Sequence, residues 1–183
     1  MIESLDVRAR SCTACALSHT RTQVVVGSGS LEARVALVGE APGRSEDEGG
    51  EPFIGRSGRL LFDLLAEIDI ARDDCFVTNV VKCRPPKNRP PTRGEIGACR
   101  PWWDEQRAAL KAAVVVTLGN TATRAVLSRR EGIGELHGRA VALDDRWVVP
   151  TYHPAAALRG GNSVVAVMRE DLATVAALLR GRS

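Results

Sequence analysis

Four short apolar runs, rich in β-branched residues, constrain the fold of this chain more than any other feature. They cover residues 35–39, 75–81, 113–119 and 147–151, and their first residues lie 40, 38 and 34 positions apart. Intervals of this length leave room for a helix between successive strands. Because strands that alternate with helices pair in parallel and are covered on both faces, the runs predict an α/β fold with a parallel sheet between helices.

Apolar positions at helical spacing predict where those helices lie. Residues 57–70 place five aliphatic side chains on one helical face, and residues 95–110 and 120–129 are further candidates. A last helix over residues 163–180 repeats the pattern. The chain has 183 residues, a length that suits one core better than two, so we expect a single domain over residues 1–183.

The composition is that of a globular protein rather than of a disordered or membrane-spanning chain. Hydrophobic residues make up 44% of the chain and charged residues 26%. No apolar run approaches the roughly 20 residues of a membrane span, and the N-terminus lacks the apolar stretch of a signal peptide. We therefore expect a cytoplasmic monomer with no membrane partner. The net charge of +3 permits nucleic-acid binding without requiring it.

Five cysteines in a chain without an export signal favour a metal or cluster site over disulfides, because the cytosol keeps thiols reduced. Two residues separate Cys12 from Cys15, and fifteen separate Cys83 from Cys99. Cys75 lies within an apolar run, where a small core residue is the simpler interpretation. Four thiolates suit either zinc or an iron–sulfur cluster, and the spacing alone leaves both open.

Unusual segments follow each of the four apolar runs. They are GEAPG at residues 39–43, NVVKCRPP at 79–86, Gly119-Asn120, and YHP at 152–154. In an open α/β sheet, ligands bind beyond the carboxyl ends of the strands. These four segments therefore predict a binding site at one edge of the sheet, whereas residues 84–93, rich in Pro and Arg, are expected to form a surface loop.

Seven segments of the chain resemble the family 4 uracil-DNA glycosylases, the iron–sulfur cluster-containing branch of the uracil-DNA glycosylase superfamily. The resemblance runs from Cys12 to about Gly160. The segments are CTAC, TRTQVV, VGEAPGRSEDEGGEPFIGRSGRLL, TNVVKCRPPKNRPPT, ACRPW, LGNTA and PTYHPAAALR. GEAPG alone is weak evidence, whereas seven segments in the order and spacing of the family are highly specific.

The resemblance implies a three-layer α/β/α fold around a central four-stranded parallel sheet. It assigns Cys12, Cys15, Cys83 and Cys99 to a four-iron four-sulfur (4Fe-4S) cluster with a structural rather than a catalytic role. It also implies the reaction, in which uracil is flipped out of DNA and its N-glycosidic bond is hydrolysed to leave an abasic site. This is the first step of base excision repair, and uracil-containing DNA is accordingly the expected partner.

The resemblance places the residues that hold uracil at the strand ends. Phe53 matches the aromatic residue that stacks on the base. The carboxamide of Asn79 can accept from uracil N3–H and donate to O4, and cytosine presents the opposite pattern at both atoms. His153 is expected to be catalytic, because a donor facing uracil O2 stabilises the negative charge of the departing base. The sequence leaves the protonation state of His153 open.

By the same resemblance, Glu46 lies near C5 of uracil, where its bulk opposes the methyl group of thymine. Glu40, the second expected catalytic residue, lies on the pocket floor or positions water, and Ala41 and Gly43 complete the expected substrate-binding set. Ala41 stands where family 1 enzymes carry an Asp that aligns water. The sequence therefore leaves open which residue activates water. A dissociative route through an oxocarbenium-like sugar is favoured, because it depends least on a general base.

Two segments are expected to hold the DNA backbone. Gly55, Arg56 and Ser57 precede or begin a helix, whose exposed N–H groups could receive a phosphate. Residues 154–160 correspond to the loop that enters DNA in this superfamily, with Leu158 either an apolar wedge or a core residue and Arg159 a phosphate ligand. The remaining histidines, His19 and His137, are expected in surface or loop positions.

Two other functions fit part of the sequence. A uracil-trapping relative would bind uracil covalently through a histidine between Cys83 and Cys99, but that interval, RPPKNRPPTRGEIGA, contains no histidine. A non-catalytic cluster protein, such as an electron carrier or redox sensor, would explain the cysteines but not Phe53, Asn79 and His153 at strand ends. Release of uracil from an oligonucleotide distinguishes these possibilities from a glycosylase.

Overall fold

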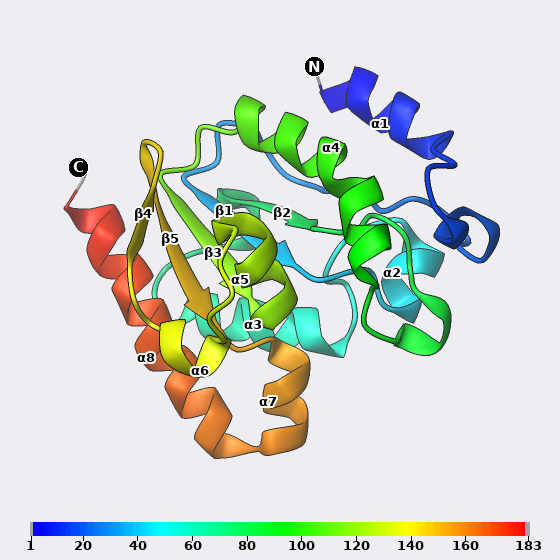
Figure 1. The fold of residues 1–183 in the computed structure, drawn as a ribbon. Helices are drawn as coiled ribbons and strands as arrows, with labels where there is room; N and C mark the ends of the chain where they lie inside the picture. The colour runs from blue at the N-terminus through cyan, green and yellow to red at the C-terminus, as the bar shows by residue number, and fades with distance from the viewer. Residues whose placement is uncertain (1, 182–183) are drawn as a thin grey trace.

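The computed structural model describes residues 2–181 and is built around one sheet (Figure 1). Its strands are β1 (Val35–Gly39), β2 (Cys75–Asn79), β3 (Val114–Leu118), β4 (Val141–Leu143) and β5 (Arg146–Thr151). They lie in the order β2-β1-β3-β5-β4, and every pair is parallel except the antiparallel β4–β5 pair. The four predicted strands and their parallel pairing are therefore confirmed.

Helices connect and cover the strands. They are α1 (Ile2–Arg10), α2 (Arg44–Gly49), α3 (Arg56–Ala66), α4 (Arg93–Ala109), α5 (Gly119–Leu127), α6 (Ile133–Leu136), α7 (Pro154–Gly160) and α8 (Asn162–Arg180). Short 3-10 turns are η1 (Ala16–His19), η2 (Arg72–Asp74) and η3 (Pro86–Asn88). The four helices predicted from apolar spacing correspond to α3, α4, α5 and α8.

Successive residues of the central strands face two separate cores, which is why both faces of the sheet need helices. In β1, Val35 and Leu37 belong to one core, whereas Ala36 and Val38 belong to the other. The first core is closed by side chains of α3, α7 and α8, and the second by side chains of α4, α5 and α6. Figure 1 shows α3 and α5 on opposite sides of the sheet. The observed architecture is thus three-layered, as predicted.

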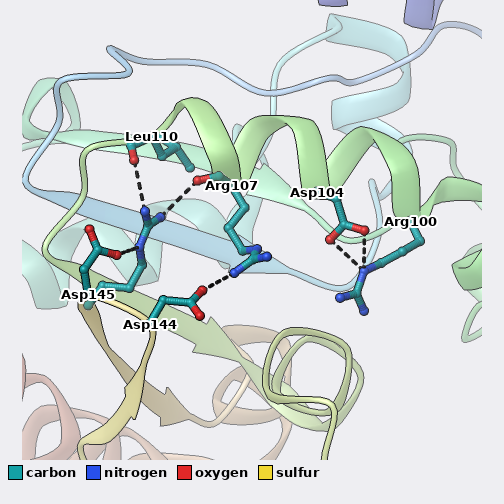
Figure 2. A network of polar contacts seen from close by, with 7 residues as sticks. Arg100, Asp104, Arg107, Leu110, Asp144 and Asp145 are labelled. Atoms are coloured by element: carbon teal, nitrogen blue, oxygen red, sulfur yellow. Dashed lines mark hydrogen bonds and ion pairs between the residues drawn. The ribbon is translucent and has the colours of Figure 1, made fainter.

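The prediction of four strands was wrong by one, because β4 forms an antiparallel edge beside β5. Ion pairing fixes the β4–β5 turn to the end of α4 (Figure 2). Arg107 pairs with Asp144, which adopts a left-handed backbone with φ of 54°. Arg146 donates to the carbonyls of Arg107 and Leu110, at 3.1 and 3.3 Å. A strand of three half-buried or exposed residues carries too little apolar patterning to be found in the sequence.

One other prediction needs correction. Residues 154–160, expected to be a loop, form α7, whose first position is proline, a residue preorganised for that place in a helix. His137, expected at the surface or in a loop, lies in the turn after α6, which confirms the loop position, and its Nδ1 lies 3.0 Å from the buried carboxylate of Asp171. Among residues 2–181, no helix is both long enough and apolar enough to cross a membrane.

Candidate functional site

A cleft of about 740 Å³ opens beyond the carboxyl ends of β1, β2, β3 and β5. The strand register makes these ends level, because Gly39 of β1 pairs with Asn79 of β2 and Leu118 of β3 pairs with Thr151 of β5. Segments that follow four different strands therefore meet in one place. The predicted site residues that line the cleft are Glu40, Ala41, Gly43, Glu46, Phe53, Ser57, Asn79, His153 and Arg159.

Phe53 lies between the core and the cleft. Its residue is only 6% exposed, yet it contributes to the cleft wall, and its ring centroid lies 5.9 Å from that of His153. Its φ of 55° is in the left-handed region, which residues other than Gly, Asn and Asp rarely adopt. A planar ring held in such a strained position suits stacking on a flat ligand.

Asn79 ends β2 with its side chain toward the same wall and is 2% exposed. No hydrogen bond to its carboxamide is found among the residues that the structure describes, so both polar atoms are available to a ligand in the cleft. Gly39 on the neighbouring strand makes this position possible. A Cβ at Gly39 would lie 2.3 Å from Asn79 Oδ1 and 2.6 Å from Phe53 Cζ, well inside van der Waals contact.

We expect Gly39→Ala to damage the site more than the fold. The added methyl group must push away the Asn79 amide, the Phe53 ring or both, because its Cβ would lie 2.3 Å from Asn79 Oδ1 and 2.6 Å from Phe53 Cζ. Ligand binding in the cleft should fall by at least about tenfold, while the melting temperature falls by only a few degrees. Calorimetry alongside a binding titration checks this. A variant that binds as tightly as the parent would contradict it.

His153 follows β5 and is the N-cap residue of α7. Its surroundings determine its protonation state, which the sequence left open. Its Nδ1 accepts a hydrogen bond from the backbone N–H of Ala155 at 3.1 Å. Burial of the ring, and secondarily the charge of Arg159, lower the pKa of His153 to about 4. The ring is therefore neutral at pH 7 with its proton on Nε2, a donor rather than a cation.

Glu46 connects the start of α2 to the start of α3. Its Oε1 accepts from the backbone N–H of Gly55 at 3.0 Å, and a Cβ at Gly43 would lie 2.7 Å from Oε2. The glycine therefore leaves room for the carboxylate. Glu40 lies beside them on the cleft wall, directly after β1, and its carbonyl accepts from the N–H of Val81 at 3.0 Å.

The expected DNA-binding residues are only partly brought to the cleft. Ser57 lines it, whereas Gly55, Arg56 and Leu158 are not among the described residues of its wall. The N–H of Gly55 already donates to Glu46, so this group is not free for a phosphate in the present arrangement. Leu158 on α7 is 43% exposed, which excludes the alternative that it is a core leucine. Arg159 reaches the cleft from the next position of the same helix.

Away from the cleft, four of the five cysteines, all except Cys75, surround one small cavity on the side of α1 and α4. Cys12, Cys15, Cys83 and Cys99 all line it. Burial is the main cause that raises the pKa of the Cys83 thiol, and it raises that of Cys99 to about 11; the nearby Cys12 raises both pKa values further. Among residues 2–181, no three His, Cys, Asp or Glu side chains form a group suited to a single metal ion.

Cys75 is separate from this cavity. It is fully buried at the start of β2, its Sγ lies 3.5 Å from the carbonyl of Ala71, and its pKa is raised to about 12, mainly by burial. An unreactive thiol packed in the core agrees with the expected structural role.

Two polar residues at the cysteine cavity were not predicted from the sequence. Arg21, within the TRTQVV segment, donates to Cys83 Sγ at 3.3 Å and to the carbonyl of Cys12 at 2.8 Å. The N–H of Lys82 donates to Cys99 Sγ at 3.2 Å, while its buried Nζ binds the carbonyl of Asn79 at 2.6 Å. Two of the four sulfurs, those of Cys83 and Cys99, therefore accept N–H groups, which are the donors that stabilise thiolates against the effect of burial.

Comparison with known proteins agrees with the site geometry. The family model described as the uracil DNA glycosylase superfamily matches residues 26–173. A type-4 uracil-DNA glycosylase of Thermotoga maritima is 41% identical over 175 residues, which cover 94% of this chain and 91% of that protein. One from Sulfurisphaera tokodaii is 40% identical, with 93% and 81% covered. A type-5 uracil-DNA glycosylase of Pyrobaculum aerophilum is 35% identical, but over only 69% of this chain. The chain therefore belongs to the uracil-DNA glycosylase superfamily and, within it, to the type-4 uracil-DNA glycosylases.

Proposed function

We propose that this protein excises uracil from DNA by hydrolysing the N-glycosidic bond, leaving an abasic site for base excision repair. One observation carries the proposal: an aromatic ring, an unpartnered carboxamide and a neutral imidazole meet in a single cleft at the strand ends. These are the three groups needed to stack a flat base, to read its edge and to stabilise its departure. Membership of the type-4 enzymes supports the same reaction.

In the proposed complex, the flipped base stacks on Phe53 and presents its polar edge to Asn79. The carboxamide Oδ1 accepts from N3–H, and Nδ2 donates to O4. His153 donates from Nε2 to O2, because Nδ1 is occupied by the N–H of Ala155. As the glycosidic bond stretches, negative charge grows on O2 and the sugar becomes positive. The neutral ring stabilises this charge without itself losing a proton, and Glu40 assists water from the cleft wall.

Glu46 is proposed to exclude thymine. Its carboxylate is held by the N–H of Gly55 at 3.0 Å, so it cannot swing freely away from a methyl group at C5. A fixed obstacle discriminates better than a mobile one, because the cost of the clash is not relieved by rotation.

Replacing Glu46 by Gly is expected to relax this exclusion. The variant should excise thymine from a mismatch at a measurable rate, because both the bulk and the anchor at Gly55 are lost. Excision of uracil should change less than excision of thymine. The measurement is the ratio of single-turnover rates on matched oligonucleotides with uracil or thymine at one position. A ratio as large as that of the parent enzyme would show that the exclusion lies elsewhere.

DNA is proposed to be held on both sides of the cleft mouth. Arg56 at the start of α3 and Arg159 on α7 are exposed cations beside it, suited to phosphates that flank the target nucleotide. Ser57 would add a hydroxyl donor, whereas the N–H of Gly55 is already used by Glu46. Leu158, 43% exposed on α7, is an apolar group available to enter the stack that the base leaves.

We further propose that Cys12, Cys15, Cys83 and Cys99 hold a 4Fe-4S cluster. The donor set fits, because all four sulfurs line one cavity and two of them already accept N–H groups from Arg21 and Lys82. When bound, such a cluster would supply a covalent link between the N-terminal segment, the loop after β2 and α4. The excision steps use the strand-end residues and need no electron.

Cys75→Ala tests the choice of four cysteines. Iron and sulfide content should match the parent protein prepared anaerobically, since Cys75 lies in the core and outside the cysteine cavity. Cys99→Ala, the matched variant inside the cavity, should lose most of both. Visible absorbance and elemental analysis measure this. Loss of iron in Cys75→Ala, or stoichiometric zinc without iron in the parent, would contradict the assignment.

Base specificity tests the proposed function directly. Oligonucleotides that differ only in one base, uracil, cytosine or thymine, should yield abasic sites at the uracil position alone. Formation of equal amounts at cytosine or thymine would contradict the proposed recognition. A stable protein–DNA adduct would instead support the covalent trap that the interval between Cys83 and Cys99, without a histidine, disfavours.

A further inference from the structure

Outside the cleft, Arg72 forms hydrogen bonds to the strained backbone at Phe53. This residue belongs to η2, just before β2, and is not among the described residues that line the cleft. Its Nη2 donates to the carbonyl of Pro52 at 2.7 Å, and its Nη1 to the carbonyl of Phe53 at 3.4 Å. The same guanidinium therefore binds the carbonyls of two consecutive residues, 20 and 19 positions earlier in the sequence.

The guanidinium is itself held in position. It lies over the ring of Phe62 on α3, 4.7 Å from the ring centroid, and its Nη2 is 3.9 Å from a carboxylate oxygen of Glu51. A planar cation between a ring and two carbonyls loses little freedom on forming further hydrogen bonds. Arg72 thus acts as a fixed support and not as a flexible surface side chain.

Phe53 needs such a support, because its left-handed φ of 55° is unfavourable for a phenylalanine. α3 crowds the same carbonyl, since a Cβ at Gly58 would lie only 1.7 Å from Phe53 O. The ring is confined on the other side by Gly39 and His153. A peptide unit under these constraints can relax if its hydrogen bonds are removed, and the ring would then move with it.

We infer that Arg72 is a positioning residue for base excision: it holds the Pro52–Phe53 backbone so that the Phe53 ring stands ready to stack on the base. This inference rests on the proposed function for its catalytic consequence. The support itself is a property of the free protein and can be measured without substrate. Arg72 lies just before β2, and Asn79 is the last residue of β2. The same strand therefore positions both the arginine that holds Phe53 and the amide of Asn79.

The test compares Arg72→Ala and Arg72→Lys with Arg169→Ala, a control that removes one exposed arginine whose hydrogen bonds go to Glu67 and not to the Pro52–Phe53 backbone. In Arg72→Ala, the single-turnover rate on uracil-containing DNA should fall roughly ten- to a hundredfold, with DNA affinity unchanged. Millimolar guanidinium chloride should restore part of the rate, and sodium chloride at equal concentration should not. Arg72→Lys should retain more activity than Arg72→Ala, and Arg169→Ala should match the parent.

Amide hydrogen exchange supplies the readout that does not depend on activity. Amides of residues 53–58 should exchange faster in Arg72→Ala than in the parent, while the central strands keep their protection. Unchanged exchange in this segment, or a parental excision rate, would overturn the inference. If the parent protein itself releases no uracil, the proposed function fails, and the exchange measurement still decides whether Arg72 holds Phe53.

Discussion

Replacing Asn79 by Asp should lower uracil excision by about 10²- to 10⁴-fold, corresponding to roughly 3–5 kcal/mol, because one buried donor is lost and a buried negative charge is added. An aspartate cannot donate to uracil O4, and its charge repels both that oxygen and the anionic leaving base. Asn79 is 2% exposed, so water cannot replace the missing donor easily. Any gain on cytosine should be small, because cytosine N3 still lacks a donor unless the carboxyl group is protonated.

The comparison requires single-turnover rates on uracil and cytosine for parent and variant, together with DNA affinity. Asn88→Asp is a suitable control, since this residue also lines the cleft but hydrogen-bonds Arg84 through its Oδ1, which aspartate retains. A folded Asn79→Asp enzyme that excises uracil at the parental rate would remove Asn79 from recognition.

His153→Ala is expected to reduce the excision rate by about 10²–10³-fold, the usual cost of one donor to a developing oxyanion. The pH dependence of the excision rate identifies which protonation state of His153 is active. With a pKa of about 4, His153 stays neutral from pH 8 to about pH 5, so its contribution to the rate should be constant over that range. A rate that rises as pH falls through 6.5 would instead indicate a protonated, cationic imidazole.

The same pKa predicts a change in stability. Burial holds the pKa in the folded protein below the ordinary value of 6.5, so between pH 6.5 and about 4 the unfolded chain binds a proton that the folded protein refuses. The free energy of unfolding should therefore fall as pH falls through this window. Denaturant titrations of the parent and His153→Ala should show a smaller pH dependence in the variant.

Features with long apolar patterns were readable from the sequence. The four central strands, their parallel pairing and α3, α4, α5 and α8 each have a run or face long enough to leave a periodic signal. Placement of the site followed from the fold, because segments after parallel strands must meet at one edge. The resemblance supplied the individual roles, and the cleft brings together Phe53, Asn79 and His153 as it implied.

Other features depend on contacts between distant residues and had no local signal. The three residues of β4 are fixed by Arg107 and Arg146, and α7 begins where a loop was expected. Nothing in the sequence around Arg72 indicates that it reaches the carbonyls of Pro52 and Phe53. Likewise, the tautomer of His153 depends on a single backbone N–H of α7, which only the folded chain brings to Nδ1.

The most direct test of the account is the amount of free uracil released under multiple-turnover conditions. Uracil-containing oligonucleotide in large excess over protein should yield many molecules of free uracil per protein molecule, with an equal number of abasic sites. Asn79→Asp and His153→Ala should release far less. Absence of free uracil, or release that stops at one base per protein with formation of a covalent adduct, would contradict the claim that this cleft is the active site of a uracil-excising hydrolase.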